Sequence, residues 1–381
     1  MFRLMAAFLF ALATGWSSVA AWAQEPVPVG VHHQTVWVPD FYGSLVNKYV
    51  TDFTTSPPTF VASAIDVSSY SCNPNSVAIK GARIYVVCNS DYGGPDEILV
   101  FNDTTFNYVK TIDGTGPSGA GGTFPYFSGS GLIGIAFDMH GNLWVTGYGA
   151  NSLYRIPLAE LSSASPQIDR QVVDSPDLPA GITFTAAGAA WVVGQYGGGI
   201  LVKFPDSVIN GPGTFLHNSP DNLNPQLCLS NILTDCHPTS GLFNNPEGVA
   251  VFDGAVWVSN NGGNAPGRKL VRAVPEAGQA FATSKYGHAA NAPFSCPGGL
   301  FTSTLAGATP ELWVNDEGFG FENGTCGSSS ATQGSGVGLV HAFTASDLLN
   351  NPTAPTPEAF KGAAKLKTGS PGFGGVFVQL D

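Results

Sequence analysis

A two-part apolar motif recurs five times along the chain. Each copy has a short apolar segment introduced by Gly or Pro, a tight turn, and a second segment of aromatic and branched apolar residues. Internal repeats of roughly 40–50 residues are typical of solenoids and propellers. The five copies are Ser76–Ile79 with Ile84–Val87, Gly134–Phe137 with Leu143–Val145, Gly181–Phe184 with Ala190–Val193, Gly248–Val251 with Val256–Val258, and Gly298–Phe301 with Leu312–Val314.

A sixth copy is divided between the two ends of the chain. Its first segment is Gly375–Val378 and its second is Val36–Val38. A repeat completed across the termini predicts a closed ring without free strand edges. We therefore expect an all-β fold, a six-bladed β-propeller closed by pairing of N-terminal and C-terminal strands in one blade, forming a single domain over residues 24–381. The 48 Gly, 28 Pro and 11% charged residues agree with many short strands and turns.

The first 23 residues have the pattern of a secretory signal peptide. Arg3 provides the positive charge, Met5–Thr14 the apolar core, and Ala21–Ala23 a small-x-small cleavage site. The alternative, an anchoring helix, is disfavoured because Gly15 and Ser17 interrupt the apolar run. We expect a secreted or periplasmic protein with no membrane span after cleavage.

The formal net charge of −12 argues against nucleic acid as a partner, since phosphates require a basic surface. The chain also has no basic cluster that would bind an anionic membrane. We expect a monomer whose partner is a small molecule or a protein.

Export makes the six cysteines candidates for disulfides, and six cysteines allow about 15 pairings. The positions of the cysteines in the repeats favour three local pairs over free buried thiols. These pairs are Cys72 with Cys88, Cys228 with Cys236, and Cys296 with Cys326.

In a propeller the loops divide between the two ends of the central channel. We expect the third repeat to end near Leu216, and the long insertions to lie where inner strands begin and second strands end. Functional residues concentrate on loops held by a rigid scaffold, so we predict the ligand site at that channel mouth. The alternative is that these are tolerated surface insertions. The insertions are Gly114–Ser130, Ser219–Asn244 and Phe319–Gly336.

Polar and aromatic residues follow the second segment of most repeats. At the channel mouth they could bind a ligand, or alternatively pack against the neighbouring blade. The candidates for ligand binding are Asp40, Asp91, Tyr148, Tyr196 and Asn260.

Carboxylates and amides that converge on the axis are the oxygen ligands of a hard divalent cation. Asn75 and Glu247 precede inner strands, and Asn315 ends a second strand. We therefore consider these three as metal ligands, with one Ca²⁺ or Zn²⁺ as the candidate cofactor. Asp316 and Glu317, which follow Asn315, are the candidate catalytic bases.

The repeats resemble those of NHL-repeat and gluconolactonase-like six-bladed propellers, including the senescence-marker and streptogramin-lyase branches. The resemblance covers about residues 31–381 and depends on Gly134–Asp138, Gly141–Val145 and Pro246–Ala250. It implies a metal on the channel axis that polarises a lactone carbonyl, with Asn75 and Glu247 at ligand positions. The equivalent positions Ile133, Ala180, Gly298 and Gly374 offer no side-chain oxygen, which departs from that pattern.

Two functions follow from these observations. The first is an NHL-like binding module for a ligand or protein at the channel mouth. The second is a metal-dependent, lactonase-like hydrolase. Repeats of this kind specify a fold much better than a reaction.

Overall fold

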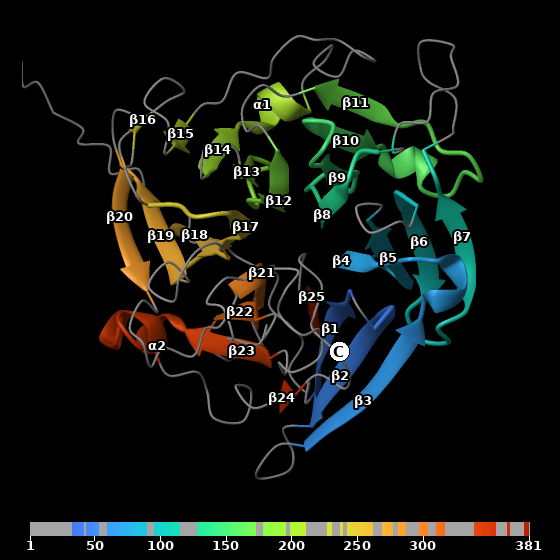
Figure 1. Cartoon of the computed structure of the whole chain (residues 1–381), viewed down its shortest axis with the longest axis horizontal. Coiled ribbons are helices and arrows are strands. Elements are labelled where there is room, and N and C mark those ends of the chain that lie inside the picture. The colour runs from blue at the N-terminus through green and yellow to red at the C-terminus, as the bar shows by residue number, and fades with distance from the viewer. Residues whose placement is uncertain are drawn as a thin grey trace, which may run out of the picture.

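The computed structural model describes residues 33–41, 43–52, 59–89, 95–114, 127, 129–172, 178–195, 199–210, 227–230, 237–238, 242–261, 269–276, 281–286, 297–303, 310–316, 339–355, 364–365 and 377–380. These residues form six small sheets arranged as blades around a common axis (Figure 1). The innermost strands of successive sheets contact one another round the ring, which confirms the six-bladed propeller.

The strands of each sheet follow one another from the axis outward. From inner to outer strand, the first sheet comprises β4 (Pro74–Lys80), β5 (Arg83–Cys88), β6 (Glu97–Asn102) and β7 (Tyr108–Ile112). The second comprises β8 (Leu132–Phe137), β9 (Leu143–Gly147), β10 (Ser152–Ile156) and β11 (Asp169–Val172). The third comprises β12 (Pro179–Phe184), β13 (Ala190–Gly194), β14 (Ile200–Phe204), β15 (Leu227–Ser230) and β16 (His237–Pro238).

The fourth sheet comprises β17 (Pro246–Phe252), β18 (Ala255–Asn260), β19 (Lys269–Pro275) and β20 (Phe281–Tyr286). The fifth comprises β21 (Pro297–Ser303), β22 (Glu311–Asp316), β23 (Leu339–Thr344) and β24 (Ala364–Lys365). The sixth comprises β25 (Phe377–Leu380), β1 (His33–Asp40), β2 (Leu45–Asp52) and β3 (Thr59–Asp66). The helices are α1 (Asp206–Ile209), α2 (Ala345–Asn350) and the 3-10 turns η1 (Ser68–Tyr70) and η2 (Leu158–Glu160).

The sixth sheet joins the two ends of the chain. β25 pairs antiparallel with β1, and Val378 is the register partner of Val36. The predicted closure by N-terminal and C-terminal strands is therefore confirmed.

The outer part of the third blade differs from the prediction. We expected this repeat to end near Leu216 and residues 219–244 to form an insertion. Instead, β14 pairs with β15, so that Val202 lies opposite Cys228. The prediction was wrong because the outer strand β15 begins only at Leu227, far along the chain from the end of β14 at Phe204.

Apolar contacts between blades form the core. Each second strand contributes a buried aromatic residue: Trp37, Tyr85, Trp144, Trp191, Trp257 and Trp313. Several of these rings lie beneath a cation of the neighbouring third strand. The Lys48 Nζ is 5.0 Å from the centroid of the Trp37 ring, and the Arg155 guanidinium is 5.8 Å from that of Trp144. The stems of these long side chains cover apolar surface while the charges face the rings.

Cys72 and Cys88 form a disulfide that links the entry of β4 to the end of β5, as predicted. The partners Cys236, Cys296 and Cys326 lie outside the described residues, and so do residues 1–23. The other two pairs and the signal peptide therefore remain predictions. Within the described ranges, no helix is long and apolar enough to cross a bilayer.

Candidate functional site

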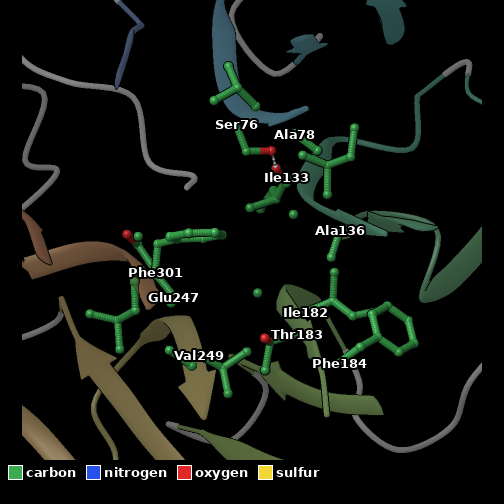
Figure 2. Close-up of a pocket in the computed structure, with 18 of the residues that line it drawn as sticks. Ser76, Ala78, Ile133, Ala136, Ile182, Thr183, Phe184, Glu247, Val249 and Phe301 are labelled. Carbon is green, nitrogen blue, oxygen red and sulfur yellow. Dashed lines mark hydrogen bonds between the residues drawn. The ribbon is translucent and has the colours of Figure 1, made fainter. Parts of the chain in front are cut away.

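A cavity of about 300 Å³ lies on the axis of the propeller. It is lined by the inner strands of five blades, β4, β8, β12, β17 and β21. A close-up shows side chains of these strands surrounding it (Figure 2). Among the described residues, the lining is mainly aliphatic and aromatic and includes one ionisable side chain, Glu247.

The inner strands share an irregularity near their starts. All five have a shift in register there, for example between Pro246 and Val249 in β17. β-Bulges of this kind bend a strand and redirect its side chains. Glycine is needed at this level because an added Cβ on Gly181 would lie 2.3 Å from the carbonyl oxygen of Glu247. The bulged segments of adjacent blades therefore pack backbone against backbone.

Hydroxyl groups join neighbouring blades at the same level. The Thr146 hydroxyl accepts a hydrogen bond from the Gly134 amide at 2.7 Å and donates to the Ala180 carbonyl at 2.5 Å. In β18, Ser259 makes the equivalent pair of bonds, to the Gly248 amide and the Gly298 carbonyl. We call this level, where the inner strands begin, the closed end of the cavity.

The exposed fraction of the lining side chains differs between the two ends of the cavity. At the closed end, Ser76 and Glu247 are 1% and 5% exposed. Toward the other end, where the turns join inner to second strands, Ala136, Thr183 and Phe301 are half-buried. We call this the open end. The more accessible part of the lining thus lies away from the mouth at which we predicted the ligand site.

One position of the inner strands differs in side-chain size between the blades. It carries a small residue in four blades and a phenylalanine in the fifth. In Figure 2 the ring of Phe301 points into the cavity, and the Thr183 hydroxyl faces it from another wall. The residues at this position are Ala78, Ala136, Thr183, Ala250 and Phe301. These five residues were not among the predicted site residues, although each occupies the same position of its repeat and this shared position could have indicated them.

Two of the predicted ligand-binding residues have local structural roles. The Asp40 carboxylate accepts a hydrogen bond from the Gly43 amide at 2.9 Å, in the turn after β1. The Asn260 side chain donates to the Leu242 carbonyl at 3.0 Å and accepts from the Asn244 amide at 3.1 Å. Both residues are fully buried and neither lines the cavity. Their hydrogen bonds fix the loops at the closed end.

The candidate base Asp316 lies in the wall of the fifth blade, not in the cavity lining. Its Oδ2 is 3.7 Å from the Nε2 of His341 on β23, and both side chains are buried. Asn315, next to Asp316, is also buried outside the lining. His341 was not among the predicted site residues, because β22 ends at Asp316 and β23 begins only at Leu339.

Tyr148 packs against the apolar cluster between the third and fourth blades, which agrees with the alternative of inter-blade packing. Three other predicted site residues, Asp91, Tyr196 and Glu317, lie outside the described residues. Their roles stay predictions.

The predicted metal ligands do not form a complete site within the described chain. Asn75 and Glu247 begin inner strands three blades apart, and Glu247 alone of the three candidates lines the cavity. No three His, Cys, Asp or Glu side chains of the described residues lie close enough together to hold a metal ion. A Ca²⁺ ion needs about six to eight oxygen ligands, which include amide and backbone carbonyl oxygens as well as carboxylates. The metal therefore stays a prediction.

Comparison with solved structures finds several proteins that are similar to this chain at low sequence identity. No protein-family model and no curated protein sequence matches the chain. Virginiamycin B lyase from Staphylococcus aureus is 14% identical, with a TM-score of 0.48 and coverage of 86% of this chain and 82% of that chain. A protein of unknown function from Bacteroides caccae is 11% identical, with a TM-score of 0.48 and coverage of 87% and 97%.

YCF48 from Cyanidioschyzon merolae is 15% identical, with a TM-score of 0.41 and coverage of 76% and 94%. At these identities the likeness concerns the fold and assigns neither a reaction nor a ligand.

Proposed function

We propose that this protein is a secreted or periplasmic propeller of the NHL-like type that binds a small ligand in its central cavity. The observation that carries this proposal is the cavity of about 300 Å³ on the axis, lined mainly by apolar side chains. Small-molecule sites are typically concave, apolar and of about 300–1,000 Å³, with a few polar groups that orient the ligand. Glu247 and Thr183 are such groups in this cavity.

The ligand would enter from the open end. Ala136, Thr183 and Phe301 are half-buried there, whereas the residues of the closed end are almost completely buried. At the closed end, hydrogen bonds join adjacent blades and the lining residues Ser76 and Glu247 are almost completely buried, so the ligand would reach Glu247 last.

Filling the cavity tests this proposal. Ala136→Phe should abolish binding of the neutral fluorescent probe phenylnaphthylamine, while Ala136→Ser should retain it. Phenylalanine already occupies the equivalent position in the fifth blade as Phe301, so the substitution suits the backbone of an inner strand. Equal probe binding by wild type and Ala136→Phe, with unchanged melting temperatures, would refute a ligand site in the cavity.

The binding hypothesis also allows a protein, in place of a small molecule, as the partner. Such a partner would contact the rims of the propeller, and its binding would not depend on the interior of the cavity. A partner captured equally by wild type and Ala136→Phe would therefore favour the protein-binding form.

A metal-dependent lactone hydrolase is the second candidate, because Glu247 places a carboxylate in the cavity wall. It would need further ligands from outside the described residues, and a base such as Glu317. Chelator-treated protein reconstituted with Ca²⁺ or Zn²⁺ should then bind one equivalent and melt at a higher temperature. If the metal content and melting temperature of wild type and Glu247→Gln are the same, this candidate is eliminated.

A further inference from the structure

Three lining side chains of the open end occupy equivalent positions in different blades. Ala136, Thr183 and Phe301 are each the register partner of the buried tryptophan in the second strand of their blade. In the ring of six inner strands, β8 is three blades away from β21, and β12 is next to β8. Ala136 therefore lies across the axis from Phe301, with Thr183 on the strand beside Ala136.

Thr183 brings a hydroxyl group to this level of the cavity. In Figure 2 its oxygen faces the cavity, and it forms no hydrogen bond to any described residue. The hydroxyls of Ser76 and Thr146 at the closed end differ, because both donate to a carbonyl of the neighbouring blade. A ligand at the level of Thr183 would shield its half-buried hydroxyl from water. An enclosed hydroxyl without a partner is unfavourable, so a ligand that supplies a hydrogen bond binds more tightly than one that does not.

Phe301 supplies a flat apolar surface at the same level. Its ring points into the cavity, and the side chain is half-buried, so part of it is accessible (Figure 2). From the wall across the axis, Ala136 presents only a methyl group. Two aromatic rings in offset or edge-to-face contact stabilise each other beyond the burial of their apolar area. This level of the cavity therefore suits an aromatic ring better than a puckered aliphatic one.

From this arrangement we infer that the cavity selects a hydroxylated aromatic molecule, with its ring against Phe301 and its hydroxyl bonded to Thr183. The inference rests on the proposed ligand site and specifies the chemical class of its ligand. The ligand hydroxyl can donate to the Thr183 hydroxyl or accept from it, because each group is both a donor and an acceptor. The volume of about 300 Å³ is at the lower end of the range for small-molecule sites, which suits a bicyclic ring system.

The pair 2-naphthol and naphthalene tests the hydroxyl contact, because the two molecules differ only in that group. Both are titrated at neutral pH against bound phenylnaphthylamine, and its displacement gives their affinities. Thr183→Val removes the protein hydroxyl and keeps the branched shape of the side chain. We expect this variant to lower the ratio of the 2-naphthol affinity to the naphthalene affinity about fivefold. Comparing both ligands on both proteins isolates the hydrogen bond, because the difference in ligand hydrophobicity cancels.

Other threonine variants are the controls. Thr183→Ser keeps the hydroxyl and should retain most of the affinity ratio. Thr283→Val is the matched control, because Thr283 also lies in a strand, β20, but is exposed and outside the cavity lining. This control should leave the ratio unchanged. If Thr183→Val does not fold, Thr183→Ala gives the same comparison.

Decahydro-2-naphthol tests the ring contact, because it carries the hydroxyl on puckered, saturated rings. The wild type should prefer 2-naphthol to this molecule, and Phe301→Leu should reduce the preference about threefold. An unchanged preference in Phe301→Leu would overturn the aromatic part of the inference.

The outcomes separate this inference from the proposed function. Binding of phenylnaphthylamine that Ala136→Phe does not weaken would refute the cavity as a ligand site. Binding that Ala136→Phe abolishes, together with an affinity ratio that Thr183→Val leaves unchanged, would keep the ligand site and overturn the inferred ligand class. Failure of 2-naphthol to displace a probe bound in the cavity would also overturn that class.

Discussion

Trp37 and Phe377 are register partners in the adjacent strands β1 and β25, although they come from opposite ends of the chain. The sixth blade is therefore assembled from segments far apart in the sequence, with β25 as its inner strand. Because each inner strand contacts those of the neighbouring blades, the ring is incomplete until β25 has paired.

Removing residues 374–381 should prevent cooperative folding. The truncated chain would leave the edge of β1 unpaired and remove an inner strand from the ring. We expect loss of the melting transition seen for the full chain, measured by calorimetry or near-ultraviolet circular dichroism. A synthetic peptide of the deleted residues should restore it. A truncated protein that melts like the intact one would contradict closure by these strands.

Although Asp96 lies just outside strand β6, we expect its side chain to stabilise the folded protein. Its carboxylate accepts hydrogen bonds from the amides of Ser130 and Gly131 at 2.8 and 3.2 Å, where the chain enters the second blade. Asp96→Asn should lower the free energy of unfolding by about 1–3 kcal/mol, because the charge is lost and an NH2 donor replaces one of the two acceptor oxygens in a buried place. Denaturant titration measures this change. The control Asp253→Asn, at an exposed turn, should have little effect, and equal effects of the two variants would argue against the role of Asp96.

Glu97 should make stability depend on pH. Burial and the negative charge of Asp113 raise the pKa of Glu97 from 4.5 to about 7. Between these two values the folded protein keeps a proton that the unfolded chain has lost, so stability should fall as pH rises through this range. Below pH 4.5 and above about pH 7 the contribution should be constant.

Unfolding midpoints at pH 4.5 and pH 8 test this expectation. The variant Glu97→Gln should lose less stability than the wild type over this interval. The exposed Glu276 provides the control, since Glu276→Gln should behave like the wild type. Parallel pH profiles for wild type and Glu97→Gln would disprove the prediction.

Lys48 should stabilise the contact between the sixth and first blades. Its Nζ lies 5.0 Å from the centroid of the Trp37 ring and 5.6 Å from that of Phe106. Lys48→Met keeps the apolar stem but removes the charge, and should lower the free energy of unfolding by about 0.5–2 kcal/mol. Lys48→Arg should retain most of the stability, because a guanidinium also binds aromatic faces. Denaturation curves that do not differ between the Met variant and wild type would show that the charge contributes nothing.

The repeats in the sequence were sufficient to predict the six blades, the split blade and the Cys72–Cys88 disulfide. Within each repeat the pairing is local, because an apolar strand, a tight turn and an aromatic strand recur close together in the chain. The split blade was predicted from the same pattern, since its two segments complete one repeat although they lie far apart in the sequence. The third blade shows the limit of such a prediction, because its outer strand β15 begins at Leu227, far along the chain from the end of β14 at Phe204.

The roles of individual polar residues were decided only by the tertiary structure. Asp40 and Asn260 end second strands and Glu247 is near the start of an inner strand, so the sequence predicts all three at the same channel mouth. In the folded chain, hydrogen bonds of the first two fix loops, whereas Glu247 lines the axial cavity. This difference arises because inner strands contact neighbours from other blades, and these distant backbones determine which side chains are enclosed and which border an open space.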